Sequence, residues 1–190
     1  KRLKSIETLG SVTVIYSDKT GTLTKNEMTV KKLYVNNKII DVSGYGYSTD
    51  GRFLVNEEVV DPKEFRLLLN IAASCNNATD TVGDPTEMAL LYAAKKGGIT
   101  EKLERIGEIP FEAEKKYMAT VHKGFAFYKG APEVILQMCN HILLDGKKRR
   151  LIDRDRAKIL GTNALMAQGA LRVLAMAVKQ DEEMYFAGLM

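Results

Sequence analysis

The chain has 190 residues, of which 45% are hydrophobic and 27% are charged, and its formal net charge is +4. This length and composition are typical of a soluble globular chain with one large domain or two small ones and a core of its own. No apolar window is long enough to cross a bilayer, and the first nine residues lack the apolar stretch of a signal peptide, which excludes a chain that spans a membrane by itself. Because the last residues stop within an apolar, strand-like run, we expect the chain to be a piece of a larger protein.

The cysteines and histidines do not form a recognisable metal site. Cys75 and Cys139 are far apart and lie in apolar helical patterns, which indicates buried thiols in a reducing compartment. His122 and His141 lack the spacing of a ligand set, and we expect them to be ordinary surface or strand-end residues.

The positive charge is dispersed except for one basic cluster, Lys147 to Arg150, which follows a predicted turn at Asp145-Gly146. No aromatic residues are interleaved with it, so the pattern favours a solvated hairpin over a contact with nucleic acid or lipid. We expect no nucleic-acid partner.

The first predicted element is a short buried strand from Ser11 to Tyr16, which ends just before Asp18 and a polar loop that contains a glycine. In open α/β sheets, ligands bind at this end of the strands. Hairpins follow, with turns predicted at Asn36-Asn37 and Asp50-Gly51, so that local antiparallel pairing replaces the parallel pattern.

Two amphipathic helices are predicted next, from Lys63 to Ser74 and from Pro85 to Lys96. The second has clear end signals: Asp84 is an N-cap candidate, Glu87 has capping-box spacing, and Gly97 can end the helix.

Further along, residues 108–123 and 124–130 are predicted to be two strands joined near Gly124, followed by a helix that begins at Pro132. Another helix is predicted from about Arg154 to Gln168, ended by Gly169, and residues 171–178 and 184–190 read as strands. The middle of the chain is therefore predicted to be an α+β unit.

The residues around Asp18 suit phosphoryl transfer. A carboxylate can attack a metal-bound phosphoryl group and form an acyl phosphate, which divides one hard displacement into two steps. Lys19 supplies positive charge, Thr20 and Thr22 supply hydroxyls, and Gly21 lets backbone amides approach a phosphate. For an isolated Asp-Lys-Thr, the alternative is a turn that caps a strand end.

The whole string "DKTGTLT", Asp18 to Thr24, resembles the phosphorylation motif of the P-type ATPases at every position, and its flanks "IETLG" and "KNEMTV" resemble the same family, closest to its calcium-pump branch. The resemblance implies an α/β protein overall. It would consist of two domains. The first is an α+β nucleotide-binding domain with a twisted antiparallel sheet flanked by helices. It would be inserted into the second, a partial phosphorylation domain that is haloacid-dehalogenase-like (Rossmann-like). The implied division is residues 1–25 for the phosphorylation domain, 26–181 for the nucleotide-binding domain and 182–190 for the start of the return.

The resemblance also implies a nucleotide site. In "GDPTEMAL", Glu87 is similar to the residue that helps to hold the adenine side, although a capping role is an alternative. In "IPFEAEKKYM", Phe111 falls where relatives stack a ring on adenine, and Lys116 is a weaker polar candidate; a core phenylalanine is the other interpretation.

Two more stretches complete the implied site. "YKGAPE" resembles the lysine motif of the family, with Lys129 reaching the nucleotide beside the small residues Gly130 and Ala131. In "GALRVLAMA", Arg172 matches a residue that contacts the phosphate end of ATP in relatives, and a structural salt bridge is the alternative.

The function implied is that of a cation pump, with calcium as the ion suggested by resemblance. ATP would phosphorylate Asp18, with Lys19, Thr20 and Thr22 around it and Mg²⁺ held by the Asp18 carboxylate and the Thr20 carbonyl. The partners would be ATP and the rest of the same pump at the cytoplasmic face of a membrane, and we expect this chain to be a monomer that binds nucleotide without turnover.

Two alternatives to this function remain. One is a haloacid-dehalogenase-like phosphatase, which usually has a second aspartate at the position of Thr20. The other is a non-catalytic nucleotide-binding module.

Overall fold

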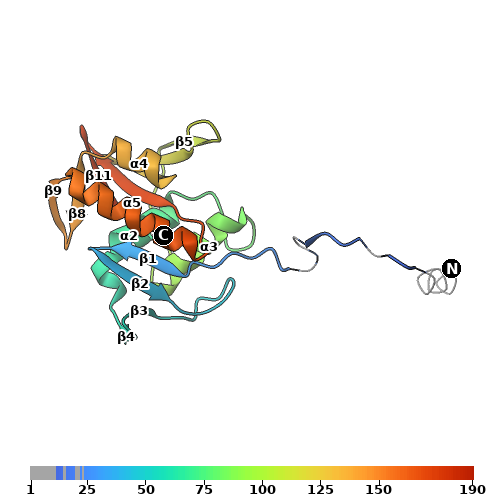
Figure 1. Cartoon of the computed structure of the whole chain (residues 1–190). Coiled ribbons are helices and arrows are strands. Elements are labelled where there is room, and N and C mark those ends of the chain that lie inside the picture. The colour runs from blue at the N-terminus through green and yellow to red at the C-terminus, as the bar shows by residue number, and fades with distance from the viewer. Residues whose placement is uncertain (1–11, 15, 20–21, 23) are drawn as a thin grey trace.

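The computed structural model describes residues 12–14, 16–19, 22 and 24–190. Within them, one sheet of eleven strands runs through the centre, in the order β4-β3-β2-β1-β11-β10-β7-β6-β5, with β8 paired to β11 and β9 to β8 (Figure 1). The pairs are antiparallel except β8 with β11. The strands are β1 (Lys32–Val35), β2 (Lys38–Val42), β3 (Phe53–Val55), β4 (Glu58–Val59), β5 (Gly107–Glu112), β6 (Tyr117–His122), β7 (Phe125–Gly130), β8 (His141–Leu144), β9 (Lys147–Arg150), β10 (Ala175–Gln180) and β11 (Glu183–Leu189).

Two predicted hairpin turns are confirmed. Asn36 and Asn37 join β1 to β2 with φ of 51° and 60°, and Asp145 and Gly146 join β8 to β9 with φ of 49° and 74°. Positive φ at both loop residues gives the turn whose twist matches that of the flanking strands, and Asn, Asp and Gly adopt it at low cost.

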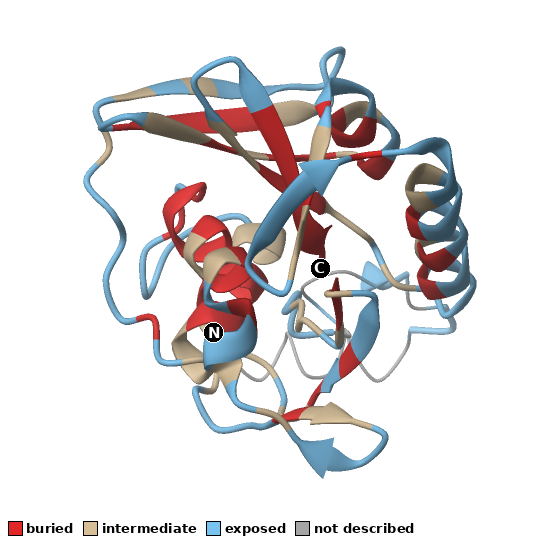
Figure 2. Ribbon diagram, turned by 90° about the vertical axis from the view of Figure 1, so that its left-hand side faces the viewer, coloured by how far each residue is buried: buried red, intermediate tan, exposed pale blue. Residues whose placement is uncertain are grey.

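Helices cover both faces of the sheet. They are η2 (Pro62–Phe65, a 3₁₀ turn), α2 (Arg66–Ser74), α3 (Pro85–Lys96), α4 (Pro132–Met138) and α5 (Asp153–Gln168). α2 packs on β7, β10 and β11 with α3 beside it, whereas α4 packs on the same strands with α5 beside it. Figure 2 shows buried residues on the inward sides of these helices and along the central strands.

Two hydrophobic clusters result, one on each face of the sheet. In β10, the side chain of Met176 joins the cluster under α2 and α3, whereas Ala175 and Ala177 join the cluster under α4 and α5. This is the two-residue alternation of a strand buried on both faces. The prediction of an antiparallel sheet flanked by helices is therefore confirmed.

The prediction of a buried strand from Ser11 to Tyr16 is wrong for its described residues. Val12, Val14 and Tyr16 are outside any strand and exposed by 46%, 59% and 95%. The blue segment that precedes β1 leads away from the sheet (Figure 1). Residues 11 and 15 are outside the described residues. A β-branched run forms a strand through its neighbours, and no described strand pairs with this one.

The prediction of a single strand over residues 108–123 also needs correction. Residues 107–122 contain two strands, β5 and β6, because a turn with Lys116 at a φ of 58° divides them. The predicted strand at residues 184–190 corresponds to β11, which lies between β1 and β10 and pairs with both. Among the described residues, no helix is both long and apolar enough to cross a membrane.

Candidate functional site

A cavity of about 320 Å³ opens between the first turn of α3, the strands β5 to β7 and the segment before β10. Its volume is at the lower end of the range for small-molecule sites. It contains five of the residues that the sequence motifs indicated, from four separate stretches of the chain. The residues that line it are Asn77, Asp84, Thr86, Glu87, Phe111, Met118, Lys129, Gly130, Arg172 and Leu174.

An ion pair between Glu87 and Lys129 crosses one wall of the cavity. Lys129 lies near the end of β7 with only 5% of its surface exposed, and its Nζ donates to Glu87 Oε1 at 2.9 Å. The backbone N–H of Asn77 donates to the other oxygen, Glu87 Oε2, at 3.0 Å. Both carboxylate oxygens are thus held, and the negative charge lies in the first turn of α3, where the helix dipole favours it.

The predicted capping box at Glu87 does not form, because its carboxylate is used by Lys129 and Asn77. The N-cap itself is confirmed: Asp84 Oδ1 accepts from the backbone N–H of Thr86 at 2.8 Å. Burial by itself would raise the pKa of Asp84, but hydrogen bonds from the side chain and backbone of Thr86 and the backbone of Glu87 outweigh it and hold the pKa below its ordinary value.

Phe111 forms an exposed aromatic wall. It lies on β5, the edge strand of the sheet, and 59% of its surface is accessible. The interpretation of Phe111 as a core residue is therefore wrong. A large exposed aromatic side chain beside a cavity offers a flat surface on which a planar ligand can stack.

Gly130 lies at the end of β7, where the close approach of β6 leaves no room for a side chain. A Cβ added there would be 2.5 Å from the carbonyl oxygen of Lys116 and 2.6 Å from Cβ of Tyr117. Glycine is therefore required at this position by the packing of the strands, in addition to lining the cavity.

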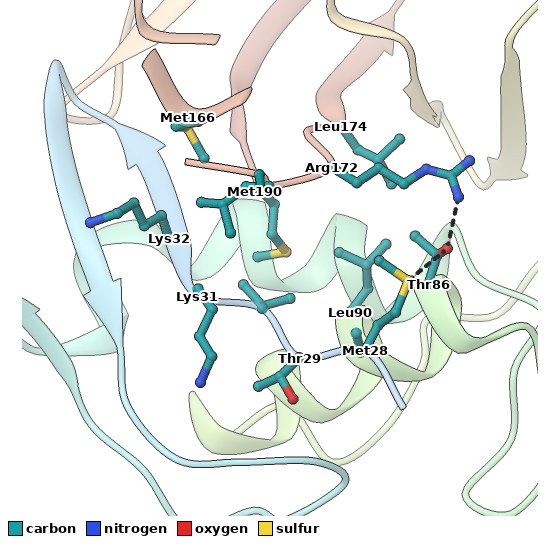
Figure 3. Close-up of a pocket in the computed structure, with 14 residues that line it drawn as sticks. Met28, Thr29, Lys31, Lys32, Thr86, Leu90, Met166, Arg172, Leu174 and Met190 are labelled. Carbon is teal, nitrogen blue, oxygen red and sulfur yellow. Dashed lines mark hydrogen bonds between the residues drawn. The ribbon is translucent and has the colours of Figure 1, made fainter. Parts of the chain in front are cut away.

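Arg172 stands between this cavity and a second, smaller one. Its Nη1 donates to Thr86 Oγ1 at 3.5 Å, and the Thr86 hydroxyl lies 3.5 Å from the sulfur of Met28 (Figure 3). The second cavity, about 170 Å³, is lined mainly by apolar side chains such as Leu90 and Met190 and shares Thr86, Arg172 and Leu174 with the first.

Two predicted binding residues are not among those that line the cavity. Lys116 is exposed in the turn between β5 and β6, where its carbonyl accepts from the backbone N–H of Ala131 at 2.9 Å. Ala131 is the N-cap of α4. Both therefore lie beside the cavity wall that Gly130 forms, and their observed contacts are backbone hydrogen bonds.

Sequence reasoning missed five lining residues. Asp84 and Thr86 lie inside the quoted motif "GDPTEMAL", so the motif itself could have indicated them. Met118 and Leu174 likewise lie inside the quoted stretches "IPFEAEKKYM" and "GALRVLAMA". Asn77 carried no such signal, since it is an asparagine in a loop outside every quoted motif.

Among the described residues, those predicted to take part in phosphorylation lie apart from the cavity in the sequence and do not line it. Asp18, Lys19 and Thr22 are exposed, and the Lys19 carbonyl accepts from the backbone N–H of Thr24 at 3.1 Å. Thr20 lies outside the described residues. Within the part of the chain that the structure describes, no three His, Cys, Asp or Glu side chains come together as metal ligands.

Comparison with known proteins identifies the family. Residues 62–188 match the family model described as P-type ATPase, cytoplasmic domain N. The chain is 39% identical to a cation-transporting ATPase of Synechocystis sp. over 98% of its length, and 39% identical to a calcium-transporting ATPase of Bacillus cereus over 100%. It is also 34% identical to a calcium-transporting ATPase of Bacillus subtilis over 94% of its length.

The chain spans only 22–23% of the length of these relatives. The match nevertheless covers more than half of the chain and includes all the residues of the cavity. The chain therefore belongs to the P-type ATPase family.

Proposed function

We propose that the cavity between α3 and β5 to β7 binds the nucleotide of ATP, and that the chain is the ATP-binding part of a cation pump. The proposal rests on one observation: four residues from four separate sequence motifs line the same cavity. They are Glu87, Phe111, Lys129 and Arg172. Calcium is the proposed ion, because two of the relatives named above are calcium-transporting ATPases.

One side of the cavity suits the base of a nucleotide, and the other side suits its phosphates. The ring of Phe111 provides a stacking surface for the base. The Glu87 carboxylate, fixed by Lys129 and Asn77, keeps lone pairs that can accept from an amino group of the base. The guanidinium of Arg172 at the other side would face the phosphates, for which a planar, fully charged donor is well suited.

We further propose that Asp18 is the residue phosphorylated in the whole protein, with Lys19, Thr20 and Thr22 around the transferred phosphoryl group. Asp18 is exposed and can be approached by a nucleotide carried from elsewhere in the molecule. Mg²⁺ would neutralise charge on the phosphates, and Asp18 and Thr20 would supply ligands to it. No three His, Cys, Asp or Glu side chains come together among the described residues, so further ligands would come from other parts of the pump.

The division into a phosphorylation domain in residues 1–25, a nucleotide-binding domain in residues 26–181 and a return that starts at residue 182 belongs to the same proposal. β11 pairs within the sheet and would be the strand through which the chain begins to leave the nucleotide-binding domain. The proposed location of this chain is the cytoplasmic face of the membrane that the pump spans.

Titration of the chain with ATP, followed by calorimetry, tests the proposal. We expect saturable binding, and we expect Phe111→Ala to weaken it by about fivefold or more, because stacking of a base on an aromatic ring contributes about 1–3 kcal/mol. Asp18→Asn should bind as the unchanged chain does. Tyr45→Ala, which removes another exposed ring outside the cavity, is the matched control.

The proposal fails if the chain shows no saturable binding, or if Phe111→Ala binds ATP as well as Tyr45→Ala does. Phosphate release is measured in the same samples, and we expect none above background, because the chain spans only 22–23% of the length of its relatives and the proposed phosphorylation site would need groups from the rest of the pump.

A further inference from the structure

Asn77 lies in the wall of the cavity, in the loop between α2 and α3, and none of the sequence motifs points to it. Its backbone N–H donates to Glu87 Oε2, so that residue 77 and the Glu87 carboxylate are immediate neighbours. The residue is exposed and is one of those that line the cavity.

The side-chain amide of Asn77 is oriented by Arg105. Nη1 of Arg105 donates to Asn77 Oδ1 and also pairs with the Glu108 carboxylate. Nη2 of Arg105 donates to the carbonyl oxygens of Ser74 at 3.1 Å and Asn76 at 2.9 Å. The guanidinium is therefore fixed at several points.

The orientation of the amide follows from chemistry. A guanidinium can only donate hydrogen bonds, so the atom of Asn77 that faces Arg105 is the oxygen. The two substituents of the amide carbon point in different directions, and the NH₂ group is turned away from the guanidinium. Asn77 and Glu87 line the same cavity, so Asn77 brings a fixed donor to the site in which the Glu87 carboxylate is an acceptor.

We propose that Asn77 is a further specificity-determining residue of this site, whose NH₂ group donates a hydrogen bond to a ring nitrogen of the bound base. This inference rests on the proposed function. Adenine has ring nitrogens that accept and an exocyclic amino group that donates at neighbouring positions, which matches a donor and an acceptor side by side. A site with such a fixed donor discriminates against a base that lacks the acceptor, because the donor is then left unpaired.

The test compares the affinities of the unchanged chain and Asn77→Ala for ATP and for 1-deaza-ATP, 3-deaza-ATP and 7-deaza-ATP, each of which replaces one ring nitrogen by C–H. We expect Asn77→Ala to weaken ATP binding about fivefold, the effect of one neutral hydrogen bond. For one of the three analogues, the two chains should bind equally well, since the partner of the hydrogen bond has already been removed. Asn163→Ala on α5, outside the cavity, is the control for an asparagine substitution.

Two results would overturn the inference: an unchanged affinity of Asn77→Ala for ATP, or the same loss for ATP and all three analogues, which would show a purely structural role. Either result leaves nucleotide binding by the unchanged chain intact. If the unchanged chain binds none of the four nucleotides, the proposed function itself fails, and this inference fails with it.

Discussion

The Glu87 carboxylate and the Lys129 ammonium depend on each other, because both are largely removed from water. The two side chains are exposed by only 17% and 6%. Removing one partner of a buried pair leaves the other charge uncompensated, which costs about 3–5 kcal/mol. The pair therefore holds the N-terminal turn of α3 to the end of β7 and sets the shape of the cavity wall.

We expect Lys129→Met to lower the free energy of unfolding by about 3 kcal/mol. The double variant Glu87→Gln with Lys129→Met should lose much less than the sum of the two single changes, since no charge is then left alone. Urea denaturation of the single and double variants measures this coupling. Lys115→Met, which breaks an exposed ion pair with Glu112, is the control and should leave the urea midpoint nearly unchanged.

If the losses in unfolding free energy for Glu87→Gln and Lys129→Met are strictly additive, the two residues act independently. That result would contradict the predicted coupling between them.

At the level of single residues, the sequence predicted those site residues that lie in recognisable local motifs. Glu87, Phe111, Lys129 and Arg172 lie in recognisable motifs, and the structure brings them to one cavity. Asn77 could not be predicted, because its orientation depends on Arg105, a residue 28 positions away on another segment.

The C-terminal end of α5 has an alanine where a glycine is favoured. Ala170 has a φ of 57°, its N–H donates to the Ala167 carbonyl, and the N–H of Leu171 donates to the Met166 carbonyl. This is the pattern of a Schellman motif, in which the residue after the cap adopts the left-handed conformation. The predicted helix-ending glycine, Gly169, stands one position earlier with a φ of −77° and does not use its conformational freedom.

We therefore expect Ala170→Gly to raise the free energy of unfolding by about 0.5–1 kcal/mol, because it relieves the left-handed strain of an alanine. Ala167→Gly, the same chemical change at an exposed position inside α5, should lower it by about 1 kcal/mol. Thermal or urea unfolding of the two variants checks the opposite signs. A loss of stability for both would mean that the strain at Ala170 is absent.

Elements with strong local signals were predictable, and those that depend on neighbours were not. The turns at Asn36-Asn37 and Asp145-Gly146 follow from residues that tolerate positive φ. The strand expected from Ser11 to Tyr16 had only β propensity to support it, and β propensity is decided by the neighbouring strands. The place of β11 inside the sheet depends on its pairing with β1, more than 140 positions away in the sequence, which a local pattern does not show.

At the scale of the whole molecule, one sheet joins two hydrophobic clusters, and each cluster contains one free cysteine. Cys75 belongs to the cluster under α2 and α3, and Cys139 to the cluster under α4 and α5. Burial raises the pKa of the Cys75 thiol and raises that of Cys139 to about 12, so few thiolates form at neutral pH in the folded state.

Because both clusters share the central strands, we expect the two thiols to become reactive in a single cooperative transition. Alkylation after brief exposure to increasing urea, followed by mass spectrometry of each cysteine peptide, should give the same midpoint for Cys75 and Cys139. Clearly separated midpoints would show that the two faces of the sheet unfold independently.

If the cavity at Glu87, Phe111 and Lys129 holds the base of a nucleotide, bound ATP must change the chemical environment of the amides around it. The most direct measurement is an amide chemical-shift map of the ¹⁵N-labelled chain during titration with ATP. We expect saturable shifts at Asn77, Glu87 and Gly130, with the amides of Lys147–Arg150 on β9 unchanged. Saturable shifts confined to the second cavity, at Thr29 to Lys32, or to the residues near Asp18, would contradict it.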